Sequence, residues 1–163
     1  MAIQKEEKTN VMRILEQKNI LYSAHTYEHE EGIAVDGVTV ANQLGQDPEQ
    51  VFKTLVARGA SKSIYVFCIP VAENLDLKKA ARAVGEKSIE MVAVKEINAL
   101  TGYVRGGCSP VGMKKQYPTV FHETAEIVDT IMVSAGKIGY QVELTPADLV
   151  ELVGGTLSDI TVV

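Results

Sequence analysis

The feature that most constrains the fold is a pair of short apolar runs, at residues 54–57 and 64–70, separated by a turn at residues 59–62. Runs of this length, rich in β-branched and aromatic residues and bounded by a glycine turn, are typical of adjacent strands. Other short runs follow, and helical segments do not separate them one by one, as they would in a doubly wound parallel sheet. The sequence instead predicts a mixed α/β fold, with a curved, barrel-like mixed sheet surrounded by helices.

Helices are predicted where capping residues bracket an apolar repeat. Thr9 is the predicted N-cap of a helix within residues 9–18, and Asp76 and Gly85 bracket another. The Asp-Pro-Glu-Gln sequence at residues 47–50 predicts a further, brief helix. The remaining helices are expected at residues 38–44, 95–100 and 146–153, and the remaining strands at residues 22–27, 119–122, 130–134, 141–144 and 160–163.

Length and charge narrow the class of protein. No repeat, linker or low-complexity tract divides the 163 residues, so residues 1–163 are expected to form a single domain. Lys and Arg together number 16 against 21 Asp and Glu, a net charge of −5. That balance argues against a protein that coats duplex DNA or RNA with a broad basic face. It leaves room for a protein that grips one end of a nucleic acid.

The sequence also predicts where the protein resides and what it does not bind. No apolar run reaches the ~18 residues of a membrane span, and the polar N-terminus does not match a signal peptide. Cys68 and Cys108 are far apart and match no zinc spacing. A cytoplasmic protein with reduced thiols, no membrane partner, no metal and no other cofactor is therefore expected.

Lys53 is the first candidate functional residue. It lies in the sequence Val-Phe-Lys-Thr-Leu-Val at residues 51–56, where every neighbour but Thr54 is apolar. Such a lysine can be held in a site, where its ammonium would polarise a carbonyl or stabilise a developing oxyanion. It can equally extend its aliphatic stem over apolar surface and keep its charge in water. The residues alone leave both interpretations open.

A glycine-rich loop, Gly-Gly-Cys-Ser-Pro-Val-Gly at residues 106–112, is the second candidate. Glycines let a backbone approach a ligand closely and direct several N–H groups at one point. The spacing matches neither the phosphate loop nor the dinucleotide fingerprint. The loop is therefore either a ligand cradle or a turn between strands. Cys108 has no identifiable base beside it in the sequence, so a packing role is expected for its thiol.

Two shorter segments supply the other polar candidates. Ser134 opens a Ser-Ala-Gly-Lys sequence at residues 134–137, which suits either a small anion or hydroxyl cradle or an ordinary hairpin turn. His25, Tyr27 and His29 alternate along an extended segment and share one face. The histidines have no evident Asp or Cys partner and are not expected to hold a metal. Tyr27 suits the polar wall of a pocket.

Together these segments resemble the YbaK/EbsC family of free-standing aminoacyl-tRNA deacylases, which are related to the editing domain of bacterial prolyl-tRNA synthetase. The resemblance extends from about Val11 to Ile160. Five segments occur in the order that the family shows: Phe-Lys-Thr-Leu at 52–55, Leu-Asp-Leu-Lys-Lys at 75–79, Thr-Gly-Tyr at 101–103, Gly-Gly-Cys-Ser-Pro-Val-Gly at 106–112 and Val-Ser-Ala-Gly-Lys at 133–137.

The resemblance implies an editing activity. The YbaK branch removes cysteine from mischarged Cys-tRNA(Pro) and also acts on Cys-tRNA(Cys). The family's essential lysine corresponds to Lys53, which is the implied catalytic residue. The implied substrate-binding residues are Tyr27, Gly106, Gly107, Ser109, Pro110, Gly112, Ser134, Gly136, Lys137 and Gln141.

The implied chemistry needs no protein nucleophile. The thiol of the cysteinyl ester can attack its own carbonyl, form a thiolactone and release the tRNA 3′ hydroxyl, provided that the enzyme holds a near-attack geometry. Lys53 and backbone amides around Gly107 are the candidates for stabilising the oxyanion. Gln141 departs from the family pattern, because relatives often carry an acidic residue there. An amide at this position bears on the rate and on the preference for cysteine.

The implied partner is the acceptor end of an aminoacyl-tRNA, and the family suggests prolyl-tRNA synthetase as a second partner. Phosphate contacts would fall to basic residues such as Lys78, Lys79, Arg82, Lys114 and Lys115. Two alternatives stay open. One is a deacylase for another aminoacyl-tRNA, such as Ala-tRNA(Pro), and the other is a non-catalytic binding module of the same fold.

Overall fold

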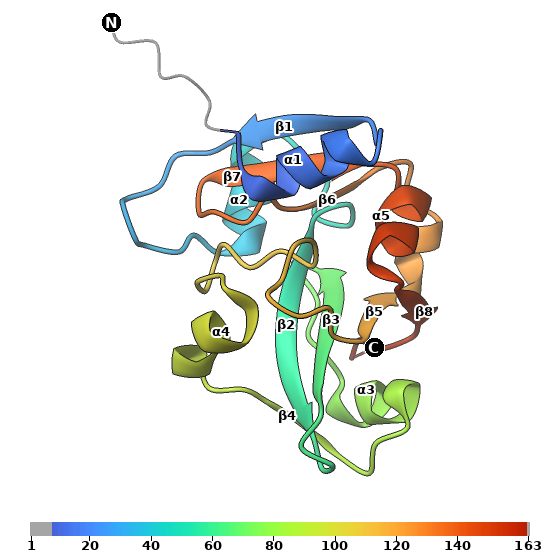
Figure 1. Ribbon diagram of the computed structural model, residues 1–163. Coiled ribbons are helices and arrows are strands. Elements are labelled where there is room, and N and C mark those ends of the chain that lie inside the picture. The colour runs from blue at the N-terminus through green and yellow to red at the C-terminus, as the bar shows by residue number, and fades with distance from the viewer. Residues whose placement is uncertain (1–7, 163) are drawn as a thin grey trace, which may run out of the picture.

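Two β-sheets form the centre of the computed structural model, which describes residues 8–162 (Figure 1). The larger sheet has the strand order β4-β2-β3-β5-β8 and the smaller has the order β1-β7-β6. The strands are β1 (Tyr22–Thr26), β2 (Phe52–Gly59), β3 (Ile64–Pro70), β4 (Ile89–Met91), β5 (Thr119–His122), β6 (Ile131–Ser134), β7 (Tyr140–Leu144) and β8 (Thr156–Ser158). The predicted mixed α/β class is confirmed.

The antiparallel hairpin of β2 and β3 lies at the centre of the larger sheet. Phe52 lies opposite Pro70 at one end of the hairpin and Arg58 opposite Ile64 at the other. β5 pairs parallel with β3, and β8 pairs parallel with β5, which makes the sheet mixed. Both faces of the hairpin are covered by hydrophobic clusters. This explains why β3 and the middle of β2 read as apolar runs instead of alternating ones.

The two sheets are joined by one isolated bridge rather than by a continuous ladder. Val51 bridges Met132, whose N–H donates to the carbonyl of Gln50 at 2.9 Å. Over residues 8–162 the strands thus form two open sheets. The barrel-like closure expected from the sequence is not confirmed, because a closed barrel needs hydrogen bonding all the way round.

Short helices surround the sheets, with α1 (Asn10–Gln17) beside the smaller sheet and α5 (Pro146–Val153) close to β5 and β8 (Figure 1). Local capping explains several of their bounds. Thr9 accepts from the N–H of Met12 at the start of α1. Asp76 accepts from two N–H groups at the start of α3 (Leu77–Val84), and Gly85 ends α3 in the left-handed conformation. None of the helices in the described part is long and apolar enough to cross a membrane. They are α1 (Asn10–Gln17), α2 (Gly37–Gln43), α3 (Leu77–Val84), α4 (Val94–Thr101) and α5 (Pro146–Val153), with a 3-10 turn at Glu123–Glu126.

Two predicted elements are wrong. Residues 47–50 form only a turn, in which Gln50 N–H donates to the carbonyl of Asp47, because β2 begins immediately afterwards at Phe52. The predicted strand at residues 160–163 is also displaced. The last strand is β8, and Thr161 forms no more than an isolated bridge with Leu75. Residue 163 lies outside the described part.

Candidate functional site

A cavity of about 790 Å³ lies where the two sheets meet. Most of its wall comes from the start of β2, the ends of the smaller sheet's strands, the segment at residues 32–37 that leads into α2, and the loop at residues 105–108, and Val40 and Val71 complete it. Among the residues predicted for the site, it brings together Tyr27, Lys53, Gly106, Ser134 and Gln141. The structure therefore gathers five predicted residues that are up to 114 positions apart in the sequence.

Lys53 lies on the cavity wall, near the start of β2 and opposite Ile69 of β3. Its side chain is partly buried. Burial lowers the pKa of Lys53 below its ordinary value, and the nearby carboxylate of Glu73 opposes that shift. The favoured interpretation is therefore a cation held in a recess, since a lysine fully extended into water would not be desolvated.

Tyr27 and Gln141 form a polar part of the wall. Tyr27 follows β1, and its backbone N–H donates to the carbonyl of Gly139 at 2.9 Å. Burial raises the pKa of Tyr27, while hydrogen bonding with the Gly139 backbone and the Gln141 side chain opposes the rise. Oε1 of Gln141 is buried and has no hydrogen-bond partner among residues 8–162. A buried acceptor without a donor is costly, so this oxygen is suited to a donor on a ligand.

Ser134 combines a cavity position with a turn. It ends β6, and its Oγ accepts a hydrogen bond from Gly136 N–H at 3.1 Å. Gly136 has φ +92°, and a Cβ there would lie 2.9 Å from the Tyr103 ring. Lys137 holds its Nζ over the Tyr140 ring, 5.5 Å from the centroid. Gly136 and Lys137 do not line the cavity, so the hairpin-turn interpretation describes them and Ser134 alone contributes to the wall.

The glycine loop is a tightly packed wall. Gly106 has φ +85°, and a Cβ there would lie 2.6 Å from Cβ of Ala34, which also lines the cavity. Gly107 donates its N–H to the carbonyl of Val104 at 2.9 Å. A Cβ at Gly107 would also lie 3.0 Å from the backbone nitrogen of Ile138. The Gly107 amide is thus engaged within the loop and is not aimed at a ligand.

Three other predicted substrate-binding residues, Ser109, Pro110 and Gly112, lie outside the cavity wall. The Ser109 hydroxyl accepts from the N–H of Val111, and the Tyr103 hydroxyl donates to the Val111 carbonyl. These hydrogen bonds hold the loop in place through residues that do not line the cavity. The geometry thus gives the second half of the glycine loop a supporting position.

Several cavity residues were not foreseen from the sequence. Arg105 is exposed at the cavity and directly precedes the glycine loop. Asp36 lies on the wall and caps α2 through the N–H of Thr39. Cys108 also lines the cavity, and burial raises its pKa to about 11. The signals at Arg105 and Asp36 were a charge beside a glycine loop and a helix cap, and neither pattern by itself indicates a cavity.

The histidines of the N-terminal segment make structural contacts. His25 Nε2 lies 2.9 Å from Glu143 Oε1, and His29 Nδ1 lies 3.3 Å from the Tyr27 carbonyl. Within residues 8–162, no three His, Cys, Asp or Glu side chains are grouped so that they could hold a metal ion.

Comparisons with known proteins agree with one another. The model of the aminoacyl-tRNA editing domain family matches residues 34–152, which include Lys53. A protein of Enterococcus faecalis, provisionally named Cys-tRNA(Pro)/Cys-tRNA(Cys) deacylase EbsC, is 44% identical over 156 residues, covering 96% of this chain and 94% of that protein.

Two solved structures share the fold. A protein provisionally described as a trans-editing enzyme for prolyl-tRNA synthetase aligns with a TM-score of 0.79 and 25% identity, over 94% of this chain and 95% of that one. The hypothetical protein APE2540 aligns with a TM-score of 0.83 over 96% of this chain and all of its own, and at 21% identity it shows the fold alone. On the family model and the Enterococcus relative, this chain belongs to the aminoacyl-tRNA editing domain family.

Proposed function

We propose that the chain is a trans-editing aminoacyl-tRNA deacylase that removes cysteine from mischarged Cys-tRNA(Pro) and also accepts Cys-tRNA(Cys). The observation that carries the proposal is Lys53, a desolvated cation on the wall of a cavity of about 790 Å³. Membership of the editing family supports the reaction class, and the name of the Enterococcus relative supports the substrate. A second proposed partner is prolyl-tRNA synthetase, which would supply the tRNA identity.

The proposed reaction uses the thiol of the substrate. Its sulfur attacks the ester carbonyl carbon, so that a C–S bond forms and the C–O bond to the tRNA 3′ ribose breaks. The thiol proton passes to the departing ribose oxygen, and the products are cysteine thiolactone and the free tRNA 3′ end. The enzyme contributes mainly geometry, because holding sulfur and carbonyl in contact makes the step intramolecular.

Lys53 has the role of stabilising charge on the carbonyl oxygen. A positive charge placed beside a developing oxyanion in a partly dry cavity is worth more than the same charge in water. The amides of Gly106 and Cys108 are the proposed second donors, because neither makes a backbone hydrogen bond within the described residues whereas Gly107 does. The unpartnered Oε1 of Gln141 is the proposed acceptor for the α-ammonium of the cysteinyl group.

Cys108 is not the nucleophile in this proposal. With a pKa of about 11, its thiol is protonated near neutral pH, and the thiolate is the reactive form. Selectivity comes from the sulfur of the substrate. Excluding alanine by size alone would contribute only about 1–3 kcal/mol, whereas a reaction that needs the thiol cannot proceed with alanine at all.

The test is single-turnover deacylation of Cys-tRNA(Pro) and Ala-tRNA(Pro) by the wild type, Lys53→Ala and Lys87→Ala. Lys87 is exposed and does not line the cavity, so its replacement is the charge-matched control. We expect loss of cysteine only, abolished in Lys53→Ala and unchanged in Lys87→Ala. Equal or faster loss of alanine would favour the alternative deacylase. No turnover of either ester would favour a binding module and overturn the mechanism.

A further inference from the structure

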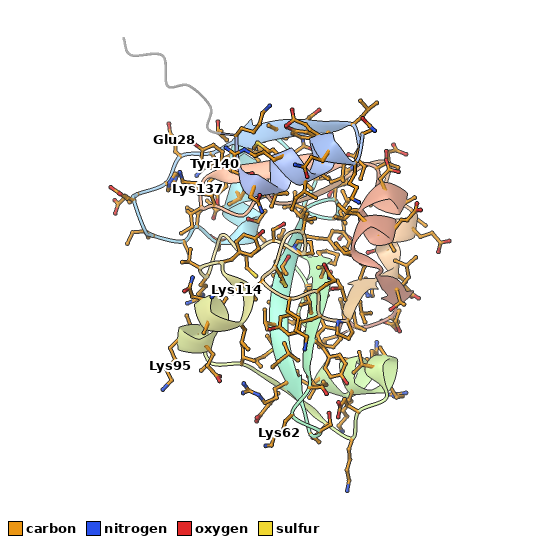
Figure 2. All side chains as sticks on the ribbon, viewed as in Figure 1. Glu28, Lys62, Lys95, Lys114, Lys137 and Tyr140 are labelled. Atoms are coloured by element: carbon orange, nitrogen blue, oxygen red, sulfur yellow. The ribbon has the colours of Figure 1, made fainter. Side chains whose placement is uncertain are left out.

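Three cations follow one another away from the cavity. Arg105 is exposed at the cavity itself. Lys114 lies against the C-terminal end of α4, just before the loop that carries Arg105. Its N–H donates to the Thr101 carbonyl at 3.0 Å, and its Cγ lies 3.2 Å from the position of a Cβ on Gly102. Lys95 is near the other end of α4, and Figure 2 shows Lys114 and Lys95 on the same side of the molecule. Arg105, Lys114 and Lys95 are called the basic track below.

The cations of the basic track lie outside the ion pairs of the described residues, although the charge of Lys95 helps to lower the pKa of the neighbouring Glu96 carboxylate, which pairs with Arg58. None of the three forms an ion pair with any residue from 8 to 162. Other cations do form such pairs: Arg58 lies 2.9 Å from Glu96, and Lys79 lies 3.0 Å from Asp159. In a protein of net charge −5, a group of exposed cations that form no ion pair beside a cavity attracts anions locally.

The other border of the cavity has the opposite charge. Glu28, Glu30 and Glu31 are exposed and directly precede the wall segment at residues 32–37. A polyanion that enters the cavity is repelled on this side and attracted toward α4. The charge pattern therefore favours one orientation of a bound nucleic acid, with its phosphates on the side of α4.

The helix α3, whose lysines were predicted to contact phosphates, packs in a different place. Ala80 and Ala81 of α3 belong to one hydrophobic cluster, whereas Ile97 and Leu100 of α4 pack with the cluster that contains Phe52 and Cys108 of the cavity. The Nζ of Lys79 is also engaged, by Asp159 and by the carbonyl of Thr161. Lys114 is therefore better placed than the lysines of α3 to contact a nucleic acid that leaves the cavity.

We propose that the basic track binds the phosphodiester backbone of the acceptor strand next to the aminoacylated nucleotide. The inference rests on the proposed function: with the ester at Lys53, the ribose and its phosphate leave the cavity past Arg105, and the preceding phosphates follow toward Lys114 and Lys95. The binding is local and independent of sequence, because point charges on flexible stems contact phosphates and not base edges.

The test compares two double variants, Lys95→Ala/Lys114→Ala and Lys62→Ala/Lys87→Ala, which remove the same charge from different places; Lys62 and Lys87 are exposed and do not line the cavity. Each is assayed with Cys-tRNA(Pro) over a range of salt and with 3′-cysteinyl adenosine, which has no acceptor strand. We expect the first double variant to lower kcat/KM for the tRNA about 2–30-fold at low salt. Its plot of log kcat/KM against log salt should be shallower by about 1.4–1.8, the value for two lost phosphate contacts. Turnover of cysteinyl adenosine should be unchanged.

Two results would overturn the proposal that the basic track binds the acceptor strand. One is an equal loss in the Lys62→Ala/Lys87→Ala variant, which would indicate that net charge and not position matters. The other is an equal loss with cysteinyl adenosine, which would indicate damage to the cavity. Fluorescence anisotropy of a labelled acceptor-stem RNA hairpin that carries no amino acid measures binding alone, and so tests this proposal separately from the proposed reaction. Salt-dependent binding that only the first double variant weakens supports the track even if no ester is cleaved, and unaltered binding refutes it.

Discussion

Replacing Gly106 by alanine tests whether the cavity depends on the close approach of its two bordering segments. Gly106 has φ +85°, and an added Cβ would lie 2.6 Å from Cβ of Ala34. The left-handed conformation costs an L-residue roughly 1–2 kcal/mol. Relieving the contact to an ordinary carbon–carbon separation of about 3.5–4.0 Å also requires a shift of roughly 1 Å. Ala34 is exposed, so the segment at residues 32–37 is expected to move outward.

Gly85 provides the matched control. It has φ +71° at the end of α3, and an added Cβ there would meet nothing within 4 Å. Gly85→Ala therefore carries the backbone strain without the collision. Overpacking typically costs about 1–3 kcal/mol, so we expect Gly106→Ala to lose that much more free energy of unfolding than Gly85→Ala.

The assays are urea unfolding and single-turnover deacylation of Cys-tRNA(Pro). Because a displacement of about 1 Å in a site can cost roughly 100-fold in rate, Gly106→Ala should lower kcat/KM by about 10–100-fold while Gly85→Ala leaves it unchanged. If the two variants unfold at the same urea concentration and cleave at the same rate, then the contact between Gly106 and Ala34 does not shape the cavity, and the reasoning fails.

Three further predictions concern single side chains. Burial lowers the pKa of Lys53, so the unfolded chain binds the proton more tightly; Lys53→Met should raise the melting temperature near pH 7 and lose that advantage as the pH rises toward 10.5, while deacylation is abolished at every pH. Cys108→Ala should keep kcat/KM within about threefold, because a thiol with a pKa of about 11 is less than about 0.1% ionised at pH 7; a loss of 100-fold or more would make it catalytic. Tyr103→Phe should lower the free energy of unfolding by about 1–3 kcal/mol in urea, since it removes the hydroxyl donor from the buried Val111 carbonyl, and an unchanged midpoint would contradict that contact.

The sequence alone was sufficient for elements whose causes are local. The helix from Leu77 to Val84 was located by Asp76 and Gly85, which act on backbone groups a few residues away. The strand Thr119–His122 was predicted with its observed bounds. Local signals also misled, since the Asp-Pro start at residues 47–50 is a good helix opening that the following strand cuts short.

The candidate site could be predicted only in part. Lys53 stood out because a cation among apolar neighbours is conspicuous in any sequence, and the structure places it on the cavity wall. The glycine loop stood out because three of its seven residues are glycine, yet of these three only Gly106 lines the cavity, while Gly107 and Gly112 serve close packing. A glycine in a sequence indicates that a side chain would not fit at that position, but it does not indicate whether a ligand or another part of the chain lies there.

What tertiary structure decided is which distant segments meet. Residues 32–37 and Arg105 became cavity residues because the loop after α4 lies against the segment before α2, in contact at Gly106 and Ala34. The short strand β8 forms because β5 offers it a parallel edge, whereas the more apolar residues 160–163 looked the better strand. Capping and turn formation depend on atoms a few residues apart and are written in the local sequence. Strand pairing and cavity walls depend on the free energy of contacts between segments far apart in the chain, and that is fixed only when the whole chain packs.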